Sequence, residues 1–247
     1  MKGKIVTFGE MMIRLSPPGY QLIKNSNSFQ IEVAGSESNV AVALSGFNTL
    51  VHYISRLPQN DLSDLAISFL KKYGVGVDDI IYGGERMGIY FLENGVSVRG
   101  GKVLYDRAYS GMASLTPGMI NWEKIFQNAV WFHWSGITPA ISASAADATL
   151  EALQIAHKMG IPISVDLNYR GNLWKYGKNP SEVMPELVKY SHLIAASPED
   201  AEVFFSIPPN SEYKCNLRKE FPNLKKIAST KRISINASHN KWSGELD

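Results

Sequence analysis

The sequence has little of what marks exported, membrane-spanning or nucleic-acid-binding proteins. Its 247 residues include one cysteine, Cys215, so no internal disulfide can form, as is typical of a reducing cytoplasm. The apolar run at residues 5–8 is far shorter than the ~20 residues of a membrane span. The 25 Lys and Arg nearly balance the 23 Asp and Glu, without a long basic block. We therefore expect a cytoplasmic protein that binds neither nucleic acid nor membranes.

Common nucleotide and metal motifs are absent as well. The sequence contains no Walker loop, no protein-kinase glycine loop and no Gly-x-Gly-x-x-Gly fingerprint. The five histidines do not have the spacing of metal ligands, and His133, in an aromatic stretch, is interpreted as a core residue. Metal ligands therefore remain unknown at this stage.

Strand-like and helix-like segments alternate along the chain. Strands are expected at residues 4–9, 51–55, 130–135, 161–166, 192–195, 226–229 and 233–238, and helices at 36–47, 62–73, 142–159, 181–190 and from 197 onward. Ser36 and Ser38 could cap the first of these helices. This order predicts an α/β fold, in which a mostly parallel sheet lies between two layers of helices, as one domain over residues 1–247.

Two antiparallel patches interrupt the alternation. Residues 88–95 form a strand that runs into Asn94-Gly95, a strong hairpin signal, and residues 103–107 can return beside it. Residues 12–15 and 29–33 form a second pair around the turn-rich residues 16–19. We expect a small accessory sheet built from two insertions, 11–33 and 86–110.

The chemistry is concentrated where predicted strands end, which is where ligands bind in open parallel sheets. Gly35 precedes a helix whose backbone N–H groups could meet an oxygen-rich ligand, and Asn39 adds a donor and an acceptor. These features suit sugar hydroxyls or a carboxylate. A capped helix start without a ligand accounts for them as well.

Two arginines follow strands in suggestive settings. Alternation places Tyr105 and Arg107 on one face of the accessory sheet, near Tyr90, so that Arg107 could clamp a carboxylate or could simply be solvated. Arg170 shares one side of its segment with Asp166 and Asn168. It could hold a carboxylate or a transferring phosphoryl group, or cap the sheet end through Asp166.

In their joint order, these segments resemble the ribokinase-like (PfkB-type) carbohydrate kinases. The resemblance rests on residues 6–10, on residues 34–41, which match the family's Gly-Gly-x-x-x-Asn-x-Ala signature, and on residues 88–90 and 105–110. Residues 132–138 and 166–174 are similar to the 2-keto-3-deoxygluconate kinases in particular. The resemblance implies a three-layer α/β/α core with a β-sheet lid.

The resemblance also implies a set of site residues and cofactors. ATP and Mg²⁺ would be the cofactors, and Ser197 and Asp200 stand where the family has Asn-x-x-Glu near the phosphates, so both end residues differ while Asp200 keeps the charge. The sugar-acid site would comprise Gly35, Asn39, Tyr90, Tyr105, Arg107, Ile137 and Arg170, and the nucleotide site Asn168, Arg170, Ser197, Asp200, Thr230 and Arg232.

The activity implied is transfer of the ATP γ-phosphate to 2-keto-3-deoxygluconate, giving its 6-phosphate. The alternatives are a kinase for a neutral sugar such as fructose, and an inactive sugar-acid-binding subunit or fragment. The family's Gly-Ala-Gly-Asp segment, whose Asp is the base, does not occur before Asp247, so no catalytic residue is assigned. A chain ending at Asp247 is expected to be inactive while keeping part of the sugar-acid site.

The accessory sheet also predicts self-association. Ile13, Ile31 and Phe91 lie on short strands that a small lid could not cover by itself. A homodimer or higher homo-oligomer that forms through the lid is therefore expected.

Overall fold

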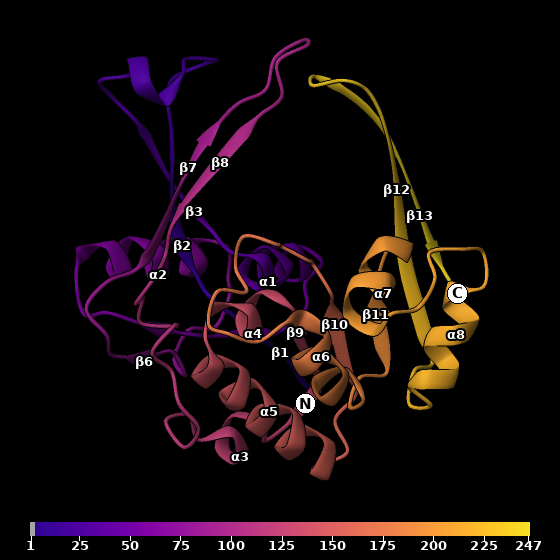
Figure 1. Cartoon of the computed structure of the whole chain (residues 1–247). Coiled ribbons are helices and arrows are strands. Elements are labelled where there is room, and N and C mark those ends of the chain that lie inside the picture. Colours follow the sequence, from indigo (N-terminus) through magenta and orange to yellow (C-terminus); the bar gives the residue numbers. More distant parts are fainter. Residues whose placement is uncertain (1–2) are drawn as a thin grey trace.

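A computed structural model describes residues 3–247 and shows a mixed α/β protein with two separate sheets and a short strand pair (Figure 1). The central sheet has seven strands in the order β13-β12-β11-β10-β9-β1-β4. All its neighbours are parallel except β12 and β13. Its strands are β1 (Lys4–Phe8), β4 (Val51–Ile54), β9 (Ala129–Ser135), β10 (Ile163–Asp166), β11 (Leu193–Ala195), β12 (Lys226–Asn236) and β13 (His239–Leu246).

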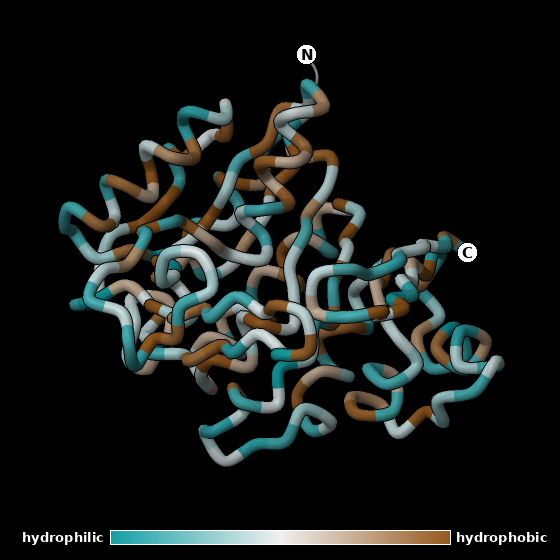
Figure 2. The backbone as a smooth tube through the Cα atoms, turned by 90° about the horizontal axis from the view of Figure 1, so that it is seen from above, coloured by the Kyte–Doolittle hydropathy of each residue, from teal (hydrophilic) through white to brown (hydrophobic). Residues whose placement is uncertain are grey.

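Helices connect the parallel strands and cover the sheet. Helical turns at the periphery of Figure 2 alternate between hydrophobic and hydrophilic colours, which fits helices that bury one side. Within residues 3–247, no helix is long and apolar enough to cross a bilayer. The helices are α1 (Ser36–Gly46), α2 (Asp61–Lys72), α3 (Trp122–Ile125), α4 (Ile137–Ile141), α5 (Ala143–Lys158), α6 (Pro180–Val188), α7 (Pro198–Phe205) and α8 (Tyr213–Glu220), with a 3₁₀ turn, η1 (Ile23–Asn25).

Strand alternation divides the core between the two faces of the central sheet. Val6 and Phe8 of β1 point to one face, where they pack with apolar residues of α3, α5 and α6. Val51 and Tyr53 of β4 point to the other face and pack with α1 and α2. Helices thus lie on both faces, and the three-layer α/β/α prediction is confirmed.

The small sheet has four strands in the order β3-β2-β7-β8. Cross-strand register aligns Glu32, Arg14, Tyr90 and Tyr105 in one row, which faces the central sheet's strand ends. The next row, on the opposite face, is Ile31, Leu15, Phe91 and Leu104. The strands are β2 (Met12–Ser16), β3 (Gln30–Ala34), β7 (Gly88–Glu93) and β8 (Lys102–Asp106), and the separate pair is β5 (Arg56–Leu57) and β6 (Ile81–Tyr82).

Several local predictions were wrong. The N-cap of α1 is Gly35, without a side-chain cap, because the Ser38 hydroxyl turns back to the Gly35 carbonyl oxygen, 3.0 Å away. Ile13 is buried in the core instead of lying on an open lid face. The β7–β8 loop turns tightly between Val96 and Arg99 instead of at Asn94-Gly95.

The C-terminal region differs most from the prediction. Residues 229–232, interpreted as a turn between two short strands, lie inside the single long strand β12. The reason is that β13, which the sequence analysis did not predict, pairs with β12 along most of its length. The chain reverses only at Asn236, whose side-chain oxygen accepts a hydrogen bond from the Ser238 N–H at 2.9 Å.

The tips of two hairpins, β7–β8 and β12–β13, lie next to each other (Figure 1). The Ala237 N–H, at the tip of β12–β13, donates to the Ser97 carbonyl oxygen, 3.0 Å away, in the β7–β8 loop. The Ser97 N–H lies 3.5 Å from the Ser238 hydroxyl oxygen. The two hairpins therefore form an arch between the small sheet and the far edge of the central one.

Trp122 anchors the face of the central sheet that packs against α5. It is 1% exposed, and its ring lies 5.0 Å from that of Phe8 and 5.8 Å from that of Phe132. We expect Trp122→Ala to lower the free energy of unfolding by about 3–5 kcal/mol, because it removes a large buried side chain and leaves a cavity.

Urea denaturation followed by circular dichroism measures this loss. Trp242→Ala is the matched control, because Trp242 is 65% exposed on β13. It should change the free energy of unfolding by less than about 1 kcal/mol. Equal losses for the two tryptophans would contradict the assignment of the core.

Candidate active site

A pocket of about 430 Å³ lies between the two sheets, at the carboxyl ends of β1, β9 and β10. The small sheet forms its other wall. It brings together all seven residues predicted for the sugar-acid site, and it also contains Asn168. Its lining comprises Glu10, Met12, Ala34, Gly35, Ser36, Asn39, Val40, Tyr90, Leu92, Val103, Tyr105, Arg107, Ile137, Asp166, Asn168 and Arg170.

The N-terminus of α1 forms the floor of this pocket. A Cβ atom at Gly35 would lie 2.6 Å from the Glu10 carbonyl oxygen and 2.8 Å from the Ser38 hydroxyl, so the chain can pass here only without a side chain. The Asn39 N–H donates to the Gly35 carbonyl oxygen at 3.0 Å, as the first hydrogen bond of α1. Asn39 itself lines the pocket. The sequence pattern predicted this placement.

Arg107 is buried and already paired, in contrast to both readings of the sequence. It is 7% exposed, and its Nε and Nη2 donate to the carboxylate of Glu10, with an Nε–Oε2 distance of 2.7 Å. The Ser110 hydroxyl donates to the other Glu10 oxygen. Since Glu10 balances its charge, Arg107 is neither solvated nor a free clamp. Sequence reasoning missed Glu10 as a site residue, although it directly follows a strand.

The two tyrosines form the pocket wall on the small sheet. Tyr90 and Tyr105 are register partners, and their ring centroids are 5.9 Å apart. The Arg107 guanidinium carbon lies 5.7 Å from the Tyr105 ring centroid. The predicted grouping of two phenols and an arginine is therefore present, with the third guanidinium nitrogen of Arg107 not used by Glu10.

Asp166, Asn168 and Arg170 line the pocket from the end of β10. Asn168 has a left-handed backbone, with φ 43°, and its side-chain amide donates to the Ser36 hydroxyl at 3.0 Å. Burial, together with the nearby charge of Asp200, raises the pKa of Asp166 to about 6. Arg170 is exposed, and within residues 3–247 it forms no salt bridge, so it does not cap the sheet end through Asp166.

A second pocket, of about 530 Å³, lies farther along the sheet, near β11 and β12. It contains Ser197, Thr230 and Arg232 from the predicted nucleotide site, whereas Asn168 and Arg170 line the first pocket. Asp200 lines neither pocket: its side-chain oxygen accepts hydrogen bonds from the N–H and hydroxyl of Ser197, at 3.0 and 2.9 Å, in the capping box of α7.

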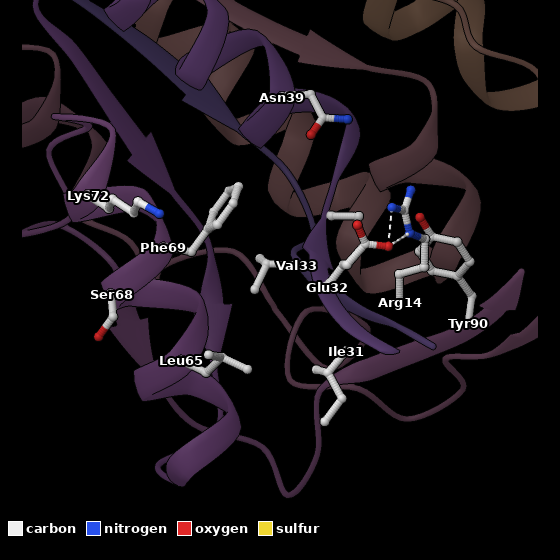
Figure 3. A pocket seen from close by; sticks show the side chains of 11 residues that line it. Arg14, Ile31, Glu32, Val33, Asn39, Leu65, Ser68, Phe69, Lys72 and Tyr90 are labelled. Carbon is white, nitrogen blue, oxygen red and sulfur yellow. Dashed lines mark hydrogen bonds and ion pairs between the residues drawn. The ribbon is translucent and has the colours of Figure 1, made fainter. Parts of the chain in front are cut away.

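A further hollow, of about 590 Å³, adjoins the first pocket around the free edge of β3 (Figure 3). Leu65 and Phe69 of α2 lie on one side of β3, and Arg14 and Tyr90 on the other. The Nε atom of Arg14 donates to Glu32 at 2.7 Å, so this arginine is paired within the sheet. On the α2 side this hollow is lined by Leu65, Ser68, Phe69 and Lys72, and it shares only Asn39 and Tyr90 with the predicted sugar-acid site.

Comparison with known proteins supports a kinase assignment for this architecture. The chain is 38% identical over 174 residues to a 2-dehydro-3-deoxygalactonokinase of Haloferax volcanii, and 32% identical over 175 residues to a 2-dehydro-3-deoxygluconokinase of Bacillus subtilis. Each alignment covers 70% of this chain and 54% of the relative. The chain thus spans about half the length of these curated relatives.

A solved structure of a related kinase has the same fold as this chain. The crystal structure of a 2-dehydro-3-deoxygluconokinase from Thermotoga maritima superposes with a TM-score of 0.93 at 37% identity, over 99% of this chain and 77% of that one. The ribokinase-like fold expected from the sequence is therefore confirmed. Residues 2–222 also match the sequence profile of the pfkB family of carbohydrate kinases. The chain belongs to the pfkB family of carbohydrate kinases.

Proposed function

We propose that this chain carries the sugar-acid site and part of the nucleotide site of a kinase that phosphorylates 2-keto-3-deoxygluconate or a closely related 2-keto-3-deoxy sugar acid. One observation carries this proposal: a single pocket contains two tyrosines, two asparagines and an arginine, Arg170, that forms no salt bridge within residues 3–247. The names of the relatives from Haloferax volcanii and Bacillus subtilis support the same substrate class.

Arg170 is the group that best accounts for recognition of the acid. The Arg107 charge is balanced by Glu10, whereas Arg170 is exposed to the pocket with no carboxylate partner among the described residues. A guanidinium can donate two parallel hydrogen bonds to one carboxylate. We infer that Arg170 holds the substrate carboxylate. Arg107 keeps the pocket wall in place, and its third guanidinium nitrogen is left to donate a hydrogen bond to the substrate.

The second pocket fits the phosphates of ATP. Thr230 offers a hydroxyl group and Arg232 offers a guanidinium, and both can donate hydrogen bonds to phosphate oxygens, whereas the Ser197 hydroxyl already donates to Asp200. The Arg232 Nε donates to Asn240 at 2.9 Å, and its guanidinium lies over the Trp242 ring, so its position is held in advance. Bound ATP would supply the phosphoryl group that is transferred.

Mg²⁺ would be held here by one or two carboxylates together with the ATP phosphates, and not by a metal site built from protein ligands alone. Within residues 3–247, no cluster of three or more His, Cys, Asp or Glu could hold an ion alone, and Mg²⁺ in kinases needs only one or two carboxylates besides the phosphates. Asp166 and Asp200 lie close enough for the charge of Asp200 to raise the pKa of Asp166, a repulsion that a cation would relieve. We propose these two carboxylates as the magnesium side of the site.

The residues of this chain then act by positioning. Asn39 and the tyrosines would orient the sugar hydroxyls, and the small sheet would act as a lid, since its hairpin tip already contacts Ala237 across the cleft. We assign no described residue to the role of general base. Phosphoryl transfer depends chiefly on alignment and charge stabilisation, which are the tasks that this pocket is suited to perform.

The outer face of the small sheet supports the proposal of a homodimer. Ile31, Leu15, Phe91 and Leu104 form a continuous apolar row across all four strands, and Ile31 and Leu104 are 56% and 51% exposed. A second copy would cover this row with the same row of its own, because a two-fold axis pairs identical patches. We propose that two lids associate through this face.

Replacing Arg170 tests the substrate class. If its guanidinium binds the carboxylate, Arg170→Ala should weaken ketodeoxygluconate binding by ~1.5–3 kcal/mol, roughly 10- to 150-fold in Kd. The Kd for fructose, which has no carboxylate, should rise less than about three-fold in the same variant. Titration calorimetry with both sugars measures the two effects.

Arg218→Ala is the matched control, because Arg218 is a half-buried arginine of α8 that pairs with Asp247 outside the pocket. It should leave both affinities unchanged. A wild-type chain that binds fructose more tightly than ketodeoxygluconate would refute the assignment of an acid substrate, and so would equal losses for both sugars in Arg170→Ala.

Replacing Leu104 tests the dimer. Leu104→Glu places a charge within the proposed contact, at its β8 end, so that light scattering at micromolar concentration should show monomers, whereas wild type should show dimers. Val130→Glu, at a position that is 52% exposed on β9 of the central sheet, should leave the dimer intact. A monomeric wild-type protein would rule the dimer out.

A further inference from the structure

Glu37 is a buried acid that the proposed function does not use. It lies in the first turn of α1, two residues after Gly35, yet its side chain is fully buried and absent from the pocket lining. It points beneath the pocket, toward the ends of two central strands. Burying a carboxyl group is costly unless its oxygens are matched by partners.

One oxygen of Glu37 is joined to the pocket by a chain of hydrogen bonds. The Ser135 hydroxyl, at the end of β9, donates to Glu37 Oε1. The same hydroxyl oxygen accepts the N–H of Ile137 at 3.2 Å. Ile137 lines the pocket, so Glu37 holds the turn between β9 and α4 in the conformation that places Ile137 there.

The other oxygen of Glu37 is packed against the end of β1. A Cβ atom at Gly9 would lie 1.9 Å from Glu37 Oε2, so the carboxyl group occupies the space that a side chain at residue 9 would need. Gly9 is followed by Glu10, which holds Arg107. Among the described residues, Oε2 has no hydrogen-bond partner.

Charged and titratable groups surround Glu37 on every packed element. They are Glu10 beyond β1, Tyr53 on β4, Asp166 on β10 and Arg107 from the small sheet. Burial raises the pKa of Glu37 to about 7, which outweighs the opposing effects of the Ser135 hydroxyl and Arg107. Glu37 is thus largely uncharged below neutral pH and becomes charged above it.

We propose that Glu37 is a positioning residue for the sugar pocket: its carboxyl group joins the ends of β1 and β9 to the start of α1. The identity of the ligand rests on the proposed function, but the role of Glu37 in ordering these three segments does not. A change at Glu37 should therefore affect the pocket at Gly35, Glu10 and Ile137, and leave the distant nucleotide pocket unaffected.

Two substitutions separate the hydrogen bond from the charge. Glu37→Gln keeps an oxygen that accepts from Ser135, so its ketodeoxygluconate Kd at pH 6.5 should stay within about three-fold of wild type. Glu37→Ala removes that acceptor and opens a cavity, so its Kd should rise about ten-fold, as expected for one or two lost buried hydrogen bonds. ATP affinity should not change in either variant.

Thr149→Ala is the matched control for buried polar residues. Thr149 is fully buried in α5, and its hydroxyl donates to the Ala145 carbonyl oxygen at 2.7 Å. Its loss should lower the melting temperature and leave ketodeoxygluconate and ATP binding unchanged. If Glu37→Ala behaves like Thr149→Ala, Glu37 is only structural and the proposal fails.

The pH dependence gives a readout that a purely structural role would not. In wild type, the Kd for the anionic sugar acid should rise several-fold from pH 6.5 to 8.5, because ionised Glu37 adds negative charge beside Arg107. In Glu37→Gln the rise should disappear, because the glutamine amide does not ionise over this range. An unchanged pH profile in Glu37→Gln would overturn the proposed coupling of Glu37 to the pocket.

Hydrogen exchange tests the role of Glu37 without a ligand. The amide of Ile137 should exchange faster in Glu37→Ala than in Glu37→Gln or wild type, because the Ser135 hydroxyl that accepts from it loses its own acceptor. Unchanged exchange at Ile137 would refute the positioning role. Faster exchange in a protein that binds no sugar acid would refute the proposed function alone.

Discussion

The buried ion pair between Glu10 and Arg107 is the contact on which the rest of the site depends. Glu10 lies where the chain leaves the central sheet, and Arg107 lies where it leaves the small sheet, so one carboxylate fastens the two sheets together. Ser110 completes the contact by donating to the second oxygen. Moving the small sheet away would separate the pair and leave two buried charges without partners, which costs free energy. The contact therefore opposes changes in the position of the small sheet. The ion pair therefore fixes one side of the pocket between the sheets.

This pair also determines how charge is distributed in the pocket. An arginine that already has a carboxylate cannot supply a full positive charge to a ligand, whereas Arg170, on the opposite wall, can. The two guanidinium groups therefore differ in their surroundings, although the sequence presents both as arginines after a strand. The phenols of Tyr90 and Tyr105 then provide a polar, uncharged wall that suits sugar hydroxyls.

Local rules predicted those parts of the site that depend on one segment at a time. Strand ends predicted the positions of Gly35 and Asn39, and alternation predicted that Tyr90 and Tyr105 face each other. The pairing of Glu10 with Arg107 could not be predicted, because it joins residues 97 positions apart and depends on how two sheets pack. The break expected between strands 226–229 and 233–238 was wrong, since pairing with β13 keeps residues 226–236 in one strand, β12.

The two buried acids near Gly9 differ because their partners differ. Glu10 meets a guanidinium and a hydroxyl, while Glu37, which lies against the same short segment, meets one hydroxyl and has a second oxygen without a partner among residues 3–247. Only the missing side chain at Gly9 allows the second carboxyl group to fit. The low-dielectric environment that strengthens the ion pair therefore also raises the pKa of Glu37 to about 7. The same short segment therefore borders two acids of different character: Glu10, which links the sheets, and Glu37 of α1, whose charge changes near neutral pH.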